Sequence, residues 1–165
     1  MVLEFDVLTG EVVVDGEKLN RKKLIDFLKK ASERIDKSTG ECYCSDNLIY
    51  ISLTEKIERS GIQMKADFSA DTANNWVAME FYKYISIEQL SLKKTKEEKK
   101  NFILKVCDAW LSSFAENYSA QWFSKRTTEN GFVFQYFWGE IALISRIFPD
   151  GNSAAKVIVR LEENR

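Results

Sequence analysis

Hydrophobic residues recur with two different periods along the chain, and each period predicts a different kind of element. Asn20 is a plausible N-cap for a helix that Ser38-Thr39-Gly40 should end, and between them the apolar residues are three and four positions apart, which places them on one helix face. In residues 48–53 and again in residues 62–68 they alternate with polar residues, which is typical of half-buried β-strands. This part of the chain therefore predicts a helix followed by an antiparallel meander.

Local signals mark a hairpin near the start of the chain and a long helix near its middle. Thr9 and Gly10 lie between two short strand-like segments within residues 2–14, as in a β-hairpin that Asp15-Gly16 closes. Thr95-Lys96-Glu97-Glu98 matches a capping box, which predicts the start of the second helix. The apolar stripe that follows consists of Phe102, Ile103, Val106, Cys107, Trp110, Leu111 and Phe114.

The second half of the chain is dominated by strand patterns separated by turn residues. The predicted strands span residues 76–85, 121–127, 132–138, 141–148 and 155–161. Residues 1–165 contain no proline-rich or serine-rich linker. We therefore expect a single α+β domain of antiparallel sheet with two main helices, in the order ββ-α-βββ-α-ββββ.

Composition removes several classes of enzyme, because the sequence contains no histidine. Histidine is the commonest general base and metal ligand, so its absence excludes Ser/His/Asp and Cys/His nucleophile systems and H-E-x-x-H zinc sites. Chemistry that uses carboxylates, lysine or tyrosine alone passes this filter. The composition favours a binding protein that is not an enzyme.

The charge balance also limits the partners. The 24 basic and 25 acidic residues give a net charge of −1, without the local basic excess typical of nucleic-acid-binding proteins. The sequence shows no export signal and no apolar run long enough for a membrane span. We expect a cytoplasmic protein with reduced cysteines, no membrane association and no direct contact with nucleic acid.

No motif predicts a metal or a cofactor. Cys42 and Cys44 form a C-x-C pair without histidine partners, which matches structural zinc sites poorly, and Cys107 lies in the apolar stripe of the second helix. The glycines are isolated, so phosphate-binding loops are absent. We expect neither a cofactor nor a metal.

One set of carboxylates supports an alternative reading as an enzyme. Asp67, Glu80 and Lys83 have the residue types of a magnesium-dependent nuclease, in which acids hold the metal and a lysine polarises water. On a strand, however, Glu80 and Lys83 point to opposite faces. A hydrolase or nuclease that uses Asp67 and Glu80 is therefore the second hypothesis, and ordinary surface charge is the simpler explanation.

Aromatic and acidic residues near turns are the candidates for partner contact. Phe132, Phe134, Tyr136 and Trp138 share one strand face, and one of the two faces should belong to the core. Coverage of both faces is the more common arrangement in an aromatic-rich domain. The residues that we expect to contact a partner are Asp71, Trp76, Glu129, Tyr136, Trp138 and Asp150.

Two segments resemble a family of small cytosolic immunity proteins encoded beside polymorphic toxins of the Rhs and contact-dependent inhibition types. Phe5 to Gly16, which includes Thr9-Gly10-Glu11, resembles the hairpin that opens these proteins. Phe137-Trp138-Gly139-Glu140-Ile141 and the segment Gly151 to Val159 resemble their closing hairpin. The prolyl segment often found after the first hairpin is replaced here by Glu17-Lys18-Leu19-Asn20.

The resemblance implies that the protein binds and neutralises a cognate toxin domain, with no catalytic residue of its own. Toxins of such systems are most often nucleases. A scaffold or phage-related interaction protein with another partner is a third hypothesis, and the sequence leaves the oligomeric state open.

Overall fold

The computed structural model describes residues 3–35, 42–53, 65–115, 118 and 122–162. Its two antiparallel sheets and its helices confirm the predicted α+β class. The helices are α1 (Arg21–Ser32), α2 (Ile87–Leu90) and α3 (Lys96–Phe114). The strands are β1 (Leu3–Asp6), β2 (Glu11–Val14), β3 (Glu17–Leu19), β4 (Cys42–Cys44), β5 (Leu48–Leu53), β6 (Lys65–Asp71), β7 (Trp76–Ile85), β8 (Ser124–Thr128), β9 (Gly131–Tyr136), β10 (Gly139–Ile147) and β11 (Ser153–Leu161).

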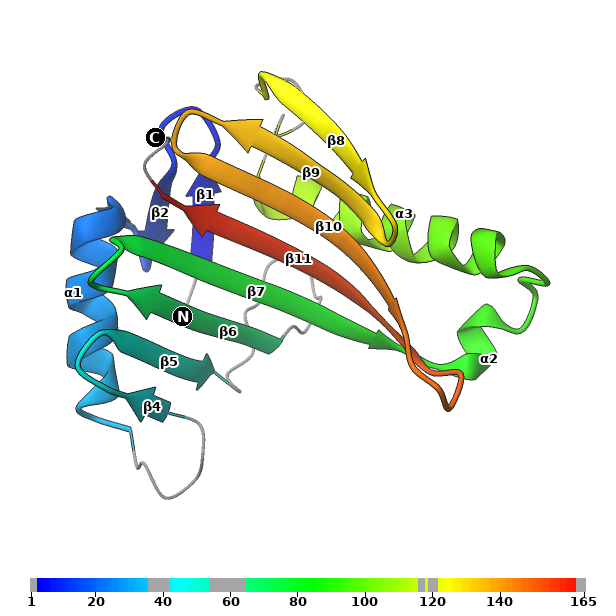
Figure 1. Ribbon diagram of the computed structural model, residues 1–165, viewed down its shortest axis with the longest axis horizontal. Helices are drawn as coiled ribbons and strands as arrows, with labels where there is room; N and C mark the ends of the chain where they lie inside the picture. The colour runs from blue at the N-terminus through cyan, green and yellow to red at the C-terminus, as the bar shows by residue number, and fades with distance from the viewer. Residues whose placement is uncertain (1–2, 36–41, 54–64, 116–117, 119–121, 163–165) are drawn as a thin grey trace.

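The strands form a small sheet of order β1-β2-β3 and a large sheet of order β4-β5-β6-β7-β11-β10-β9-β8. Because β11 pairs with β7, the last strand of the chain joins the meander β4 to β7 to the hairpins β8 to β10 (Figure 1). The two halves of the sequence therefore share one continuous sheet.

Three short elements were not expected from the sequence. The strands β3 and β4 have three residues each and α2 has four, so none is long enough to show a hydrophobic period. Asp15-Gly16 therefore connects β2 to a third strand instead of closing a two-stranded hairpin. Helix α1 ends at Ser32, earlier than predicted, and the residues 38–40 expected to end it lie outside the described residues, as do residues 62–64 of the predicted strand before Phe68.

The helices α1 and α3 begin where the sequence predicted. The side chain of Asn20 accepts a hydrogen bond from the backbone N–H of Lys23 at 3.0 Å and caps α1. Thr95 and Glu98 form the predicted capping box of α3. Both helices are thus fixed at their N-termini by local hydrogen bonds.

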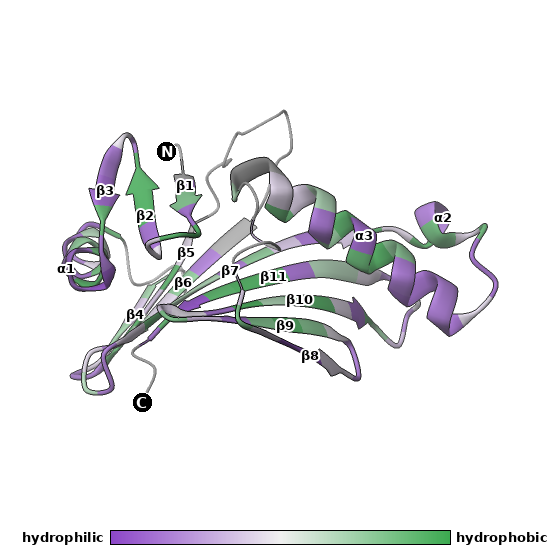
Figure 2. Cartoon of the chain, turned by 90° about the horizontal axis from the view of Figure 1, so that it is seen from above, coloured by the Kyte–Doolittle hydropathy of each residue, from purple (hydrophilic) through white to green (hydrophobic). Residues whose placement is uncertain are grey.

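The helices α1 and α3 and the small sheet lie on one face of the large sheet, as Figure 2 shows from above. Helix α3 packs on β10 and β11, and α1 packs across β4 to β7. We call this the covered face. Val77, Met79 and Phe81 of β7 point into it and are at most 1% exposed.

Trp138, in the turn between β9 and β10, connects the two sheets. Its indole Nε1 donates a hydrogen bond of 2.7 Å to the carbonyl of Val7, and its ring meets that of Phe5 edge-on at 5.0 Å. Gly10 lies so close that a Cβ there would be 2.4 Å from the Cγ of Trp138. The opening hairpin and the β9–β10 turn therefore pack against each other, in a structural role.

Candidate functional site: the open face of the large sheet

The face of the large sheet opposite to α1 and α3 is not covered by any helix or strand among the described elements (Figure 2). We call it the open face. Strand register places on it every second residue of the central strands. The side chains on this face include Tyr50, Ser52, Asp67, Trp76, Glu80, Tyr82, Tyr84, Lys156 and Arg160.

Asp67 is the centre of a cluster of hydroxyl groups on this face. Ser52 lies directly opposite it on β5, and the Ser52 Oγ donates a 2.7 Å hydrogen bond to Asp67 Oδ1. Burial and, next in size, the charge of Asp67 raise the pKa of the Tyr82 hydroxyl to about 12. Burial and then Asp67 also raise the pKa of Tyr50. Both tyrosines are therefore protonated at neutral pH and remain hydrogen-bond donors.

Glu80 lies opposite Asp67 on β7, so the two acids of the nuclease hypothesis are cross-strand neighbours. Glu80 Oε2 forms an ion pair with Lys156 Nζ of β11 at 2.6 Å, and both side chains are partly exposed. Lys83 is exposed and belongs to the other side of the strand, as the sequence predicted. The lysine that accompanies the acids is therefore Lys156.

Two further ion pairs lie in this region. Arg160 Nε contacts Glu162 Oε2 at 3.1 Å, and its guanidinium carbon lies 5.0 Å from the centroid of the Trp76 ring. Arg126 approaches Glu140 at 3.9 Å. Acidic and basic side chains therefore lie next to each other over this part of the described surface.

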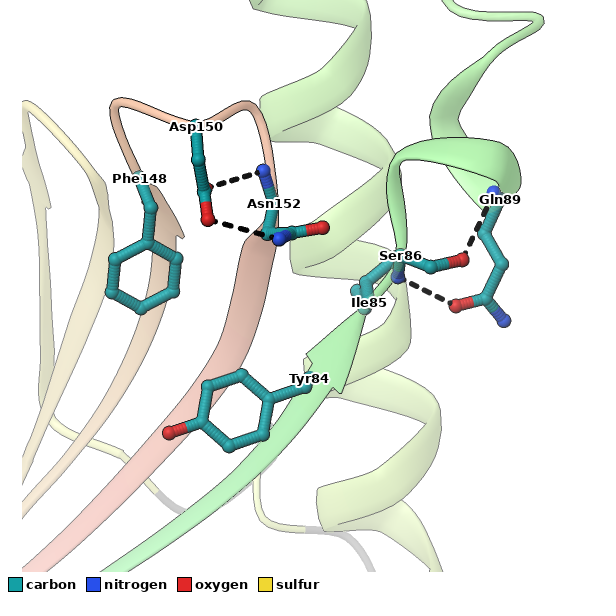
Figure 3. A pocket seen from close by; sticks show the side chains of 7 residues that line it. All are labelled: Tyr84, Ile85, Ser86, Gln89, Phe148, Asp150 and Asn152. Atoms are coloured by element: carbon teal, nitrogen blue, oxygen red, sulfur yellow. Dashed lines mark hydrogen bonds between the residues drawn. The ribbon is translucent and has the colours of Figure 1, made fainter.

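Aromatic side chains continue from the tyrosine cluster to one end of the molecule. The rings of Tyr82 and Tyr84 meet edge-on at 5.7 Å, and Tyr84 lies 6.4 Å from Phe148 in the turn after β10. Tyr84 and Phe148 line a pocket of about 530 Å³, which Figure 3 shows. The other lining residues are Ile85, Ser86, Gln89, Asp150 and Asn152.

Three of the sequence-predicted contact residues lie at the ends of the open face. Asp71 and Trp76 are paired residues beside the β6–β7 turn. Asp71 accepts hydrogen bonds from the backbone N–H groups of Ala73 and Asn74, and its hydrogen bonds with Asn74 lower its pKa. Asp150 lies in the β10–β11 turn and lines the pocket.

The other three predicted contact residues lie away from the tyrosine cluster. The expectation that Tyr136 and Trp138 contact a partner is corrected, because their side chains are only 1% and 8% exposed. Their rings stack on each other at 4.6 Å, within the core under the covered face. Glu129 is exposed in the β8–β9 turn, away from the tyrosine cluster.

The three cysteines, all in the described part of the chain, are free thiols. Cys42 is buried and Cys44 exposed, and among the described residues no group of three or more Cys, Asp or Glu is arranged to hold a metal ion. Burial raises the pKa of the Cys107 thiol to about 11, so it is protonated within the core at neutral pH. Its predicted role as a small buried residue is confirmed.

Tyr50, Tyr82, Tyr84 and Lys156 were not predicted from the sequence as site residues. A signal was present, because Glu80, Tyr82 and Tyr84 alternate with the apolar residues of β7. What the sequence does not contain is the register that brings Lys156 and Asp67 to the same patch.

Comparisons with known proteins add no relative. No protein-family model, no curated protein and no solved structure matches the chain. Among the helices described, none is long and apolar enough to cross a membrane.

Proposed function

We propose that the protein is a non-catalytic binding module whose open face binds a partner protein, and that this partner is a cognate toxin domain that it neutralises. The observation that carries the binding proposal is the tyrosine-lined open face. Tyrosine provides a large contact area for a small loss of side-chain entropy, and it is enriched where binding energy is concentrated. The resemblance of the two hairpins to immunity proteins supports the identity of the partner.

The geometry of the cluster favours protein recognition. Tyr50 and Tyr82 are held against neighbouring strands and Asp67, so little further ordering is needed when a partner binds. The locally paired charges leave specificity to shape and hydrogen bonding. Such a surface suits occlusion of a toxin active site.

The test is calorimetry with the toxin domain encoded by the adjacent gene. The wild-type protein should form a stoichiometric complex, and Tyr82→Ala should weaken it about 30-fold, because loss of a hot spot costs about 2 kcal/mol. The matched control is Leu8→Ala, since Leu8 is 60% exposed in the β1–β2 turn of the small sheet. Absence of a complex would exclude the toxin as partner, and equal losses in both variants would exclude the open face.

The second candidate is a carboxylate-dependent hydrolase or nuclease, which the cross-strand pairing of Asp67 with Glu80 favours. A divalent cation at this position would displace the ion pair of Glu80 with Lys156 and the hydrogen bond from Ser52. Magnesium-dependent cleavage of nucleic acid that disappears in a folded Asp67→Ala variant would replace the binding proposal with this one.

A further inference from the structure

The end of the open face nearest to α2 contains a pocket lined by two aromatic rings and a carboxylate. It lies between the β7–α2 junction and the β10–β11 turn, and its volume is about 530 Å³ (Figure 3). Tyr84 and Phe148 provide two aromatic walls whose planes are inclined by 34°. Tyr84 is 59% exposed, so a ligand reaches its ring from solvent.

The charge of the pocket is negative. Asp150 is the only ionisable carboxylate among the seven lining residues, all of which are described, and none of them is basic. Its Oδ1 and Oδ2 accept hydrogen bonds of 3.0 Å from the backbone N–H and the side-chain amide of Asn152. These neutral donors fix the carboxylate without neutralising it, and each oxygen keeps a lone pair for a second donor.

The opposite wall is also held in place. The Ser86 hydroxyl accepts a hydrogen bond from the Gln89 backbone N–H, and the Gln89 side-chain oxygen accepts one of 3.0 Å from the Ser86 backbone. This reciprocal capping box fixes the start of α2 beside the pocket. The walls are therefore formed before any ligand arrives, which lowers the entropic cost of binding.

The aromatic ring of Phe148 already interacts with a cation from the same chain. The guanidinium carbon of Arg146 lies 5.1 Å from the Phe148 centroid, although Arg146 does not line the pocket. Aromatic faces attract guanidinium groups, and a carboxylate nearby adds a charge-assisted hydrogen bond. Two aromatic rings and a fixed carboxylate thus complement a planar cation.

We propose that this pocket receives an arginine side chain of the partner protein, with the guanidinium against Tyr84 and Phe148 and hydrogen-bonded to Asp150. The inference rests on the proposed binding function and specifies one anchor of the partner. Arginine fits better than lysine, because its flat group stacks on a ring while its N–H donors reach the carboxylate.

The pocket can be tested without the partner, by titrating the ¹⁵N-labelled protein with N-acetyl-arginine amide. The amide signals of Tyr84, Gln89 and Asn152 should shift saturably in the millimolar range, and N-acetyl-citrulline amide, which has a similar shape and no charge, should leave them unchanged. Asp150→Asn removes the charge and keeps one oxygen that can accept the hydrogen bond from the backbone N–H of Asn152, so it should abolish the shifts. Asp26→Asn, which removes an exposed charge on α1, should retain them.

The complex then separates failure of the inference from failure of the proposed function. In the toxin complex, Asp150→Asn should weaken binding about tenfold or more, and Asp26→Asn should have no effect. If the complex forms and Asp150→Asn binds as tightly as the wild type, the pocket assignment is overturned and the binding function stands. Equal shifts with arginine and citrulline amides would also overturn it.

Discussion

At the scale of single residues, close approach of backbone to side chain decides how the two sheets are joined. Gly10 has a positive φ of 73° and lies beneath the Trp138 ring. Any larger residue would meet both a strained backbone and the indole that donates to Val7. Gly16 has a similar φ of 87°, but open space surrounds it.

Gly10→Ala and Gly16→Ala therefore form a matched pair of variants. Gly16→Ala should lower the free energy of unfolding by about 1 kcal/mol through backbone strain alone. Gly10→Ala should cost about 3 kcal/mol or more, because overpacking against Trp138 adds to that strain. Urea unfolding measures both values, and equal losses would contradict the close contact with Trp138.

At the scale of elements, helix α3 illustrates how local and tertiary signals combine. Its capping box fixes the start, and its residues Ile103, Cys107 and Leu111 have no exposed surface. The carboxylate of Glu98 accepts hydrogen bonds from the backbone of Thr95 and Lys94, which lower its pKa below the ordinary value of 4.5. The helix N-terminus is thus stabilised by an ionised Glu98 at neutral pH.

Thr95→Ala should lower the free energy of unfolding by about 1 kcal/mol, because the backbone N–H of Glu98 loses its acceptor. Lys96→Ala changes an exposed residue of the same turn and should have a smaller effect. Thermal or urea unfolding at neutral pH measures the difference. If both variants unfold alike, the capping box contributes no measurable stability.

At the scale of the whole molecule, the absence of histidine shapes the response to pH. No side chain with an ordinary pKa near neutrality exists in the chain. On the alkaline side, burial raises the pKa of Tyr136, and burial followed by the hydrogen bond to Asp108 raises that of Tyr118. These groups bind their protons more tightly in the folded state than in the unfolded one.

Stability should therefore be constant between about pH 6 and about pH 8 and fall at higher pH. The contribution of the tyrosines to the free energy of unfolding is complete below their ordinary pKa of 10.0. It is lost as the pH rises toward their higher pKa values in the folded state, and that of Tyr82 is about 12. Cys107 adds a loss that begins near its ordinary value of 9.0. The urea midpoint measured across this range reports the profile, and a Tyr136→Phe variant should show a shallower alkaline loss. A midpoint that changes between pH 6 and pH 8 would contradict this reasoning.

Periodicity and capping signals identified the long elements, since β7 and the starts of α1 and α3 lie where the sequence predicted them. These features depend on neighbours within a few positions, which a sequence displays directly. The short strands β3 and β4 were not predicted, because three residues are too few to show a hydrophobic period. Their formation depends on pairing with β2 and β5.

For the candidate site, the sequence by itself determined which functional groups are available. It contains no histidine, its cysteines match no metal-site spacing, and it places Asp150 in a predicted turn. The tertiary structure decided which residues meet. Register across β6, β7 and β11 places Asp67, Glu80 and Lys156 on one patch, and β9 buries Tyr136 on the covered face. The sequence of each strand determines which side chains lie on each of its two faces. Only the packing of the helices on the sheet determines which face remains uncovered.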